Sequence, residues 1–142
     1  MIFRTFFSTL ALASAGFTVS AASDYIGEAI IDPMTTGVVA APACPEDNRT
    51  IEFIAAVENN DAVKMEYYIG QHGCVALFAD SHGEIVGASE YGSLLEIKMT
   101  YFAQGEHDGP VRVFVDAVNL RDMSGRKNGY MMTLWRELNG FQ

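Results

Sequence analysis

The first 21 residues constrain this chain most, because they have the composition of a secretory signal peptide and not of a folded element. Arg4 is the only charged residue before Asp24, and an apolar stretch follows it over residues 6–19. The small residues from Val19 to Ala22 offer two adjacent cleavage sites. Cutting after Ala21 leaves 121 of the 142 residues, enough for one domain. We therefore expect a periplasmic or secreted protein.

The chain is strongly acidic. It has 9 Lys and Arg residues against 18 Asp and Glu residues, for a formal net charge of −9, and loss of Arg4 with the leader brings this to about −10. A protein that binds nucleic acid or an anionic lipid surface relies on a basic surface. After the leader, no stretch approaches the roughly 18 unbroken apolar residues of a membrane helix. We therefore expect no nucleic acid partner and no membrane partner after signal cleavage.

Cys44 and Cys74 are the only two cysteines. An even count in an exported chain predicts a disulfide bond between them. Closing a loop of this length stabilises a fold by about 3–4 kcal/mol in the chain-entropy model. A redox role is not indicated, since the chain has no Cys-x-x-Cys motif.

Residues 22–43 show neither a helical nor a strand period. Gly27, Pro33, Gly37 and Pro42 interrupt them. We interpret this segment as a flexible or extended arm, with one added strand as the alternative. The single folded domain is then expected over residues 44–142.

A helical hairpin is predicted over residues 45–70. Acidic residues follow Pro45 at the start of its first helix, as the helix dipole favours. Asn60 or Asp61 is expected to cap the second helix, and Gly70 to end it. The apolar faces expected to pack inward are Ile51, Ile54 and Val57 on the first helix, and Val63, Tyr67 and Ile69 on the second.

After Cys74 the period changes from helical to alternating, which predicts a β part over residues 75–138. Apolar side chains alternate with polar ones along two of its segments, residues 95–101 and 111–115. The pair Asn128-Gly129 is typical of a tight hairpin turn, so we expect a last strand from Tyr130 to Trp135. The expected fold class is α+β, an N-terminal helical hairpin followed by a small antiparallel barrel.

Two groups of residues carry a family resemblance: Gly70, Gly73 and Cys74 after the hairpin, and Gly129, Tyr130, Trp135 and Leu138 at the end. A helical hairpin that ends in the first group, followed by a β part that ends in the second, makes residues 45–138 similar to small exported bacterial proteins with an SH3-like barrel. This resemblance implies a barrel of about five strands that is used for binding and not for catalysis.

Residues with catalytic or metal-binding chemistry form no recognisable motif. The three histidines lack metal-ligand spacing. Alternation would place Asp80, His82 and Glu84 on one side of an extended segment, where they could bind a metal, but we interpret this segment as a polar turn. Ser89 lies in a sequence that resembles Gly-x-Ser-x-Gly, but the second glycine comes one place late. We therefore predict no catalytic residue, no metal ligand and no cofactor.

Aromatic residues are the remaining candidates for a binding site. Tyr91 lies in a predicted loop, while Tyr130 and Trp135 differ by five positions and so face opposite sides of a regular strand. An exposed aromatic beside Tyr91 would make a patch for a protein, a peptide or a cell-wall glycan. Tyr91, Tyr130 and Trp135 are therefore the predicted ligand-binding residues.

Three functions are consistent with these observations. The first is an exported, non-catalytic binding module of unknown ligand. The second is an acidic inhibitor or immunity-type protein that covers a basic enzyme, as the charge would favour. The third is a small secreted hydrolase, which would need a pocket that gathers two carboxylates or His82 with one.

Overall fold

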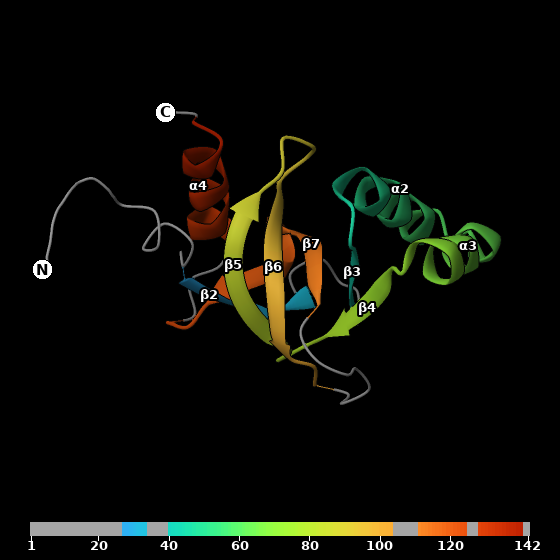
Figure 1. Ribbon diagram of the computed structural model, residues 1–142, viewed down its shortest axis with the longest axis horizontal. Coiled ribbons are helices and arrows are strands. Elements are labelled where there is room, and N and C mark those ends of the chain that lie inside the picture. The colour runs from blue at the N-terminus through green and yellow to red at the C-terminus, as the bar shows by residue number, and fades with distance from the viewer. Residues whose placement is uncertain (1–26, 34–39, 104–110, 125–127, 141–142) are drawn as a thin grey trace, which may run out of the picture.

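The computed structural model describes residues 27–33, 40–103, 111–124 and 128–140, with only the backbone of 128–130. In this part of the chain, seven strands form one antiparallel sheet in the order β4-β3-β7-β6-β5-β2-β8. The strands are β2 (Gly27–Ile31), β3 (Ala40–Cys44), β4 (Val75–Phe78), β5 (His82–Ala88), β6 (Leu94–Tyr101), β7 (Arg112–Asp116) and β8 (Leu120–Asp122). The sheet is strongly curled into a half barrel (Figure 1).

Among the described residues, three α-helices flank this sheet at its two ends. The helices α2 (Asp47–Glu58) and α3 (Ala62–His72) form a hairpin between β3 and β4. The helix α4 (Asn128–Leu138) packs at the other end, against β8 and the short 3-10 helix η2 (Ala117–Asn119). The hairpin and α4 are therefore well separated, with the central strands between them (Figure 1).

The main core fills the concave side of the sheet. Leu95, Ile97 and Met99 of β6 and Val113 and Val115 of β7 are completely buried, as the alternating pattern predicted. The intervening polar residues lie on the opposite face, because successive side chains of a strand point to opposite sides. These two strands were therefore predicted correctly.

A second, smaller cluster lies under the hairpin. It consists of Cys44, Phe53 and Cys74, with Met65 and Tyr68 packed against it. Its members come from α2, α3 and the adjoining ends of β3 and β4. The hairpin is therefore attached to the sheet through a cluster of its own.

The expected order of a helical hairpin followed by a barrel of about five strands is wrong. Two strands precede the hairpin: β2 lies within residues 22–43, the segment that was expected to be an arm, and β3 begins there and ends at Cys44. Each is inserted between strands that come much later in the chain, β2 between β5 and β8, and β3 between β4 and β7. The hairpin is consequently an insertion in the middle of a seven-stranded half barrel.

The expected last strand is also wrong, because residues 128–138 form α4. Asn128 and Gly129 begin this helix and make no hairpin turn. Met131, Leu134 and Trp135 recur at helical spacing, and all three pack against the main core. That helical spacing was present in the sequence, but the Asn-Gly pair favoured a hairpin turn followed by a strand.

The predicted hairpin itself is confirmed, with one change at its end. Asp61 caps α3 by accepting a hydrogen bond from the Lys64 amide at 3.2 Å. The helix continues past Gly70 to His72 and ends at Gly73, whose φ of 69° is left-handed.

The predicted apolar face of the second helix is exposed. The inward side of α3 is formed by Met65 and Tyr68, whereas Val63, Tyr67 and Ile69 face solvent. On the first helix the predicted Val57 packs against the small cluster with Phe53, which lies beside the predicted face, whereas Ile51 is exposed and Thr50 and Ala56 are buried.

Candidate functional site

A pocket of about 290 Å³ opens where the loop between β5 and β6 meets the first turn of α2. We call it the Tyr91 pocket, and its lining residues are Asp47, Ala88, Ser89, Glu90, Tyr91, Glu96 and Phe114. Glu96 and Phe114 are direct cross-strand partners on β6 and β7. The pocket therefore combines a loop, a helix start and the polar face of the sheet.

Ser89 fixes the loop that carries Tyr91. Its buried hydroxyl donates to Asp47 Oδ2 at 2.8 Å and accepts from the Tyr91 amide at 2.8 Å. Its carbonyl accepts from the Trp135 indole at 2.7 Å and from Asn139 Nδ2 at 3.1 Å. Ser89 thus connects α2, the loop and α4, and these bonds preorganise the pocket.

The Tyr91 pocket has an excess of negative charge. Asp47 and Glu90 carry two of its carboxylates, and Glu96 carries the third. Arg112 lies 3.7 Å from Glu96 and partly balances that charge. The ring of Tyr91 is 56% exposed beside these groups. An exposed aromatic ring next to carboxylates suits a cationic group, which interacts favourably with both.

The structure places the three predicted ligand-binding residues differently. Tyr91 lies in the pocket and is exposed. Trp135 is half-buried on α4 and donates to the Ser89 carbonyl, so it supports the loop. The backbone of Tyr130 is in α4 and not in a strand, and its side chain lies outside the described residues.

Sequence reasoning missed Asp47, Glu96 and Phe114. Asp47 was noticed only as an acidic residue at a helix start, and Glu96 only as the polar member of an alternating strand. They meet because β3, which leads into α2, pairs with β7, and β7 pairs with β6. No local sequence signal encodes that neighbourhood.

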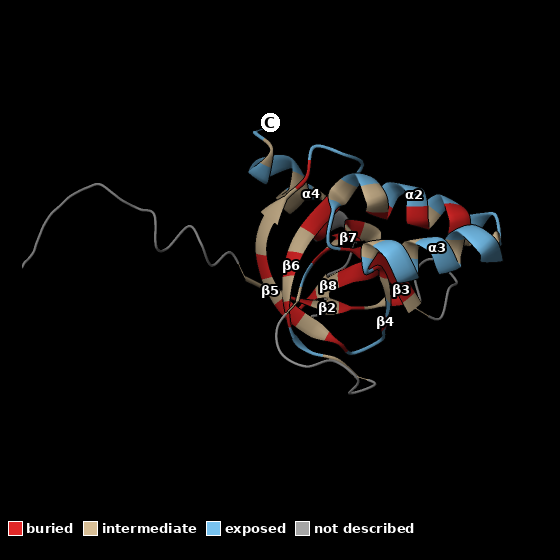
Figure 2. Cartoon of the chain, turned by 45° about the vertical axis from the view of Figure 1, so that its right-hand side comes forward, coloured by how far each residue is buried: buried red, intermediate tan, exposed pale blue. Residues whose placement is uncertain are grey.

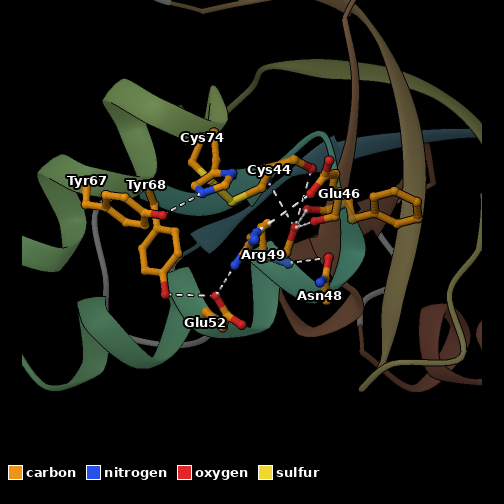
Figure 3. Close-up of a disulfide and its surroundings, with 11 residues drawn as sticks. Cys44, Glu46, Asn48, Arg49, Glu52, Tyr67, Tyr68 and Cys74 are labelled. Atoms are coloured by element: carbon orange, nitrogen blue, oxygen red, sulfur yellow. Dashed lines mark hydrogen bonds and ion pairs between the residues drawn. A yellow bond between two sulfur atoms is a disulfide. The ribbon is translucent and has the colours of Figure 1, made fainter.

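The predicted disulfide between Cys44 and Cys74 is confirmed, at a sequence separation of 30. Both cysteines are buried, and the bond joins the last residue of β3, shortly before α2, to Cys74, two residues after the end of α3 (Figure 3). It closes the hairpin at its open end. The bond is therefore a structural link in the small cluster beneath the helices.

Polar residues beside the disulfide form a network at the surface (Figure 3). Tyr68 donates to Glu52 Oε1 at 2.8 Å, and Arg49 Nη1 donates to the same oxygen at 3.0 Å. The hydrogen bond from Tyr68, followed by the one from Arg49, lowers the pKa of Glu52 below its usual 4.5. The same contact with Glu52 raises the pKa of Tyr68 above 10.0. We interpret this network as holding α3 against α2.

The alternating trio of Asp80, His82 and Glu84 does not converge on a metal. Asp80 lies 3.7 Å from Arg121 across the turn, and the ring of His82 stacks on Tyr101 with centroids 5.2 Å apart. Among the described residues, no group of three or more His, Cys, Asp or Glu is placed to hold a metal ion.

No protein-family model, no curated protein and no solved structure matches this chain. In the described part of the chain, no helix has both the length and the apolar character needed to cross a bilayer. The function therefore has to be argued from the Tyr91 pocket and from the other surfaces of the molecule.

Proposed function

We propose that this protein is an exported, non-catalytic binding module that takes a Lys or Arg side chain of a peptide or protein in the Tyr91 pocket. The observation that carries the proposal is the exposed Tyr91 ring beside the three carboxylates of that pocket. The leader sequence and the disulfide support a periplasmic or secreted location, because disulfides persist in oxidising compartments.

Physical chemistry favours a cation over a neutral ligand here. A cation over an exposed aromatic ring gains about 0.5–1 kcal/mol, and a hydrogen bond to a carboxylate is stronger than one between neutral groups. The formal net charge of −9 also attracts a basic partner over a distance. The bonds of Ser89 reduce the ordering that binding would require, because Tyr91 is already held.

The test is a titration followed by amide NMR shifts, using a flexible Gly-Ser peptide that contains one Lys-Lys pair. We expect shifts at residues 88–91, and about 2–5-fold weaker binding after Tyr91→Ala. Glu90→Gln should also weaken binding. Glu58→Gln at the end of α2 is the matched control, since it removes one exposed charge outside the pocket. A lysine-acetylated peptide that binds equally well would refute the proposal.

A small secreted hydrolase is the second candidate, because the same pocket gathers several carboxylates. Glycoside cleavage needs one carboxyl group that stays protonated, usually through apolar surroundings. Asp47 instead accepts two hydrogen bonds, and Glu96 lies 3.7 Å from Arg112, so both carboxyl groups have polar or charged neighbours and not apolar surroundings. New reducing ends released from a cell-wall glycan, and lost in Glu96→Gln, would favour the hydrolase over the binding module.

A further inference from the structure

Helix α3 directs most of its apolar side chains toward solvent. Val63 is 78% exposed, Ile69 50% and Tyr67 49%, so three of the nine large apolar side chains that are exposed in the described residues lie on this one helix. No residue of α3 is buried, and the helix is almost entirely exposed along its outer side (Figure 2). The inward contacts of Met65 and Tyr68 with the small cluster account for only one side of the helix.

Five exposed residues make up what we call the α3 face: Val63, Glu66, Tyr67, Ile69 and Gly70. Positions 63, 66, 67 and 70 are three, four and seven apart and therefore share one side of a helix, with Ile69 at its edge beside Glu66. Gly70 is the last residue of this face, and a Cβ added there would meet no atom within 4 Å. Glycine inside a helix is less favourable than alanine, and no intramolecular contact requires it here. A glycine at this position does allow a partner to approach the helix closely.

The α3 face is held in place before any partner binds. The Tyr67 hydroxyl lies 3.2 Å from His72 Nε2, and its ring makes edge contacts with the rings of Tyr68 and His72 at 5.2 and 5.1 Å. Tyr67 and Tyr68 lie side by side on the helix (Figure 3). The Asp61 cap and the disulfide fix the two ends of α3. Binding to a preorganised surface has a smaller ordering cost.

We propose that the α3 face docks an amphipathic helix of a partner protein, with a Lys or Arg placed opposite Glu66. Glu66 lies between Val63 and Ile69 on this face, so docking of an apolar surface would bury its carboxylate. A buried carboxylate without a partner is strongly destabilising, so the docked surface needs a cation at that point. A second copy of this chain would instead bring Glu66 and two net charges of −9 together. A helix is favoured because Gly70 leaves room for a close approach of two helix axes.

The test uses a synthetic 18-residue helix with leucines at i, i+3, i+4 and i+7 spacing and lysines beside them. We expect it to shift the amides of residues 63–70, and a scrambled peptide of the same composition not to shift them. Val63→Ser should weaken binding about tenfold, as at an interface hot spot. Gly70→Gln should weaken binding while raising the urea midpoint, because glutamine is the better helix former. If Gly70→Gln weakens peptide binding while it stabilises the fold, the loss of binding cannot come from a damaged structure.

Charge variants keep this surface distinct from the Tyr91 pocket. Glu66→Gln should weaken the binding that the amides of residues 63–70 report, and Glu90→Gln should leave the shifts of those amides unchanged. The proposal is overturned if the helical peptide shifts residues 88–91 and not residues 63–70, or if Val63→Ser and Gly70→Gln bind like the wild type at residues 63–70. It is also overturned if sedimentation shows a dimer that Val63→Ser dissociates, or if phosphatidylcholine vesicles and not the peptide shift residues 63–70.

Discussion

Replacing Thr50 with valine should loosen the attachment of α2 to the sheet. The Thr50 side chain is completely buried, and its Oγ1 accepts the Cys44 amide at 3.2 Å. The same hydroxyl donates to the Glu46 carbonyl at 2.9 Å. Valine keeps nearly the same shape and removes only the hydroxyl. The substitution therefore isolates the hydrogen bonds from the packing.

The expected magnitude follows from counting the groups that lose a partner. The Glu46 carbonyl still accepts the amide of residue 50 at 3.0 Å, so it stays satisfied. The Cys44 amide loses its acceptor, and an unpaired buried donor costs about 1–3 kcal/mol. The extra buried methyl group of valine returns up to about 0.8 kcal/mol. The free energy of unfolding should therefore fall by about 1–2 kcal/mol.

The measurement is urea unfolding followed by far-UV circular dichroism, together with hydrogen exchange at the Cys44 amide. Thr50→Ser is the matched control, because it keeps the hydroxyl and removes the methyl group. Exchange at Cys44 should accelerate in the valine variant and stay slow in the serine variant. If serine lost more free energy of unfolding than valine, and exchange at Cys44 did not change, the hydroxyl would not be the anchor.

Two further substitutions test the sheet and the surface network. Gly83→Ala should lower the free energy of unfolding by about 1–3 kcal/mol, because its Cβ would collide with the Lys98 carbonyl and lie 2.7 Å from Met99 Cα; a urea midpoint equal to that of the wild type would contradict this close approach. The lowered pKa of Glu52 means that its stabilisation is present above about pH 4.5 and is lost as the pH falls through its folded-state pKa. Between pH 7 and pH 3, the free energy of unfolding of Glu52→Gln should therefore fall by about 0.2–1 kcal/mol less than that of the wild type. Urea unfolding at the two pH values measures this difference, and an identical fall in the two proteins would argue against the network.

Local patterns predicted those parts of the fold whose partners are close in sequence or strongly alternating. The buried positions Ile97 and Met99 follow from strand alternation, and the Asp61 cap follows from its place before a helical period. The count of two cysteines was enough to predict the disulfide. In each case the physical cause acts within a few residues or has only one possible partner.

Strands β2 and β3 were missed because their stability comes from distant neighbours. Each has five residues, and several of the buried ones are alanines, such as Ala29 and Ala43, which give little strand signal. The pairing of Gly27 with Ile85 joins segments 58 residues apart. The Tyr91 pocket was only partly predictable for the same reason. Tyr91 could be identified from the sequence as an aromatic residue in a loop, whereas the position of Glu96 in the pocket depends on the order of the strands in the sheet.

The direction of α3 shows how a covalent link decides between two possible faces. Its sequence carries one apolar stripe with Val63 and Tyr67 and a second with Met65 and Tyr68, and periodicity alone favours neither. Cys74 lies two residues after the end of the helix and is bonded to Cys44 at the end of β3, and the second stripe packs toward Phe53.

Cys44 therefore holds both helices of the hairpin, since its sulfur fixes the end of α3 and its amide binds Thr50 of α2. Helix α3 packs on the cluster of Cys44, Phe53 and Cys74, which is separate from the main core, whereas α2 also contacts β3 and β7. Residues on the outer side of α3 belong to neither cluster. This separation explains how the chain tolerates exposed apolar side chains and a helical glycine there, and it makes the α3 face a surface on which binding can be changed without changing the fold.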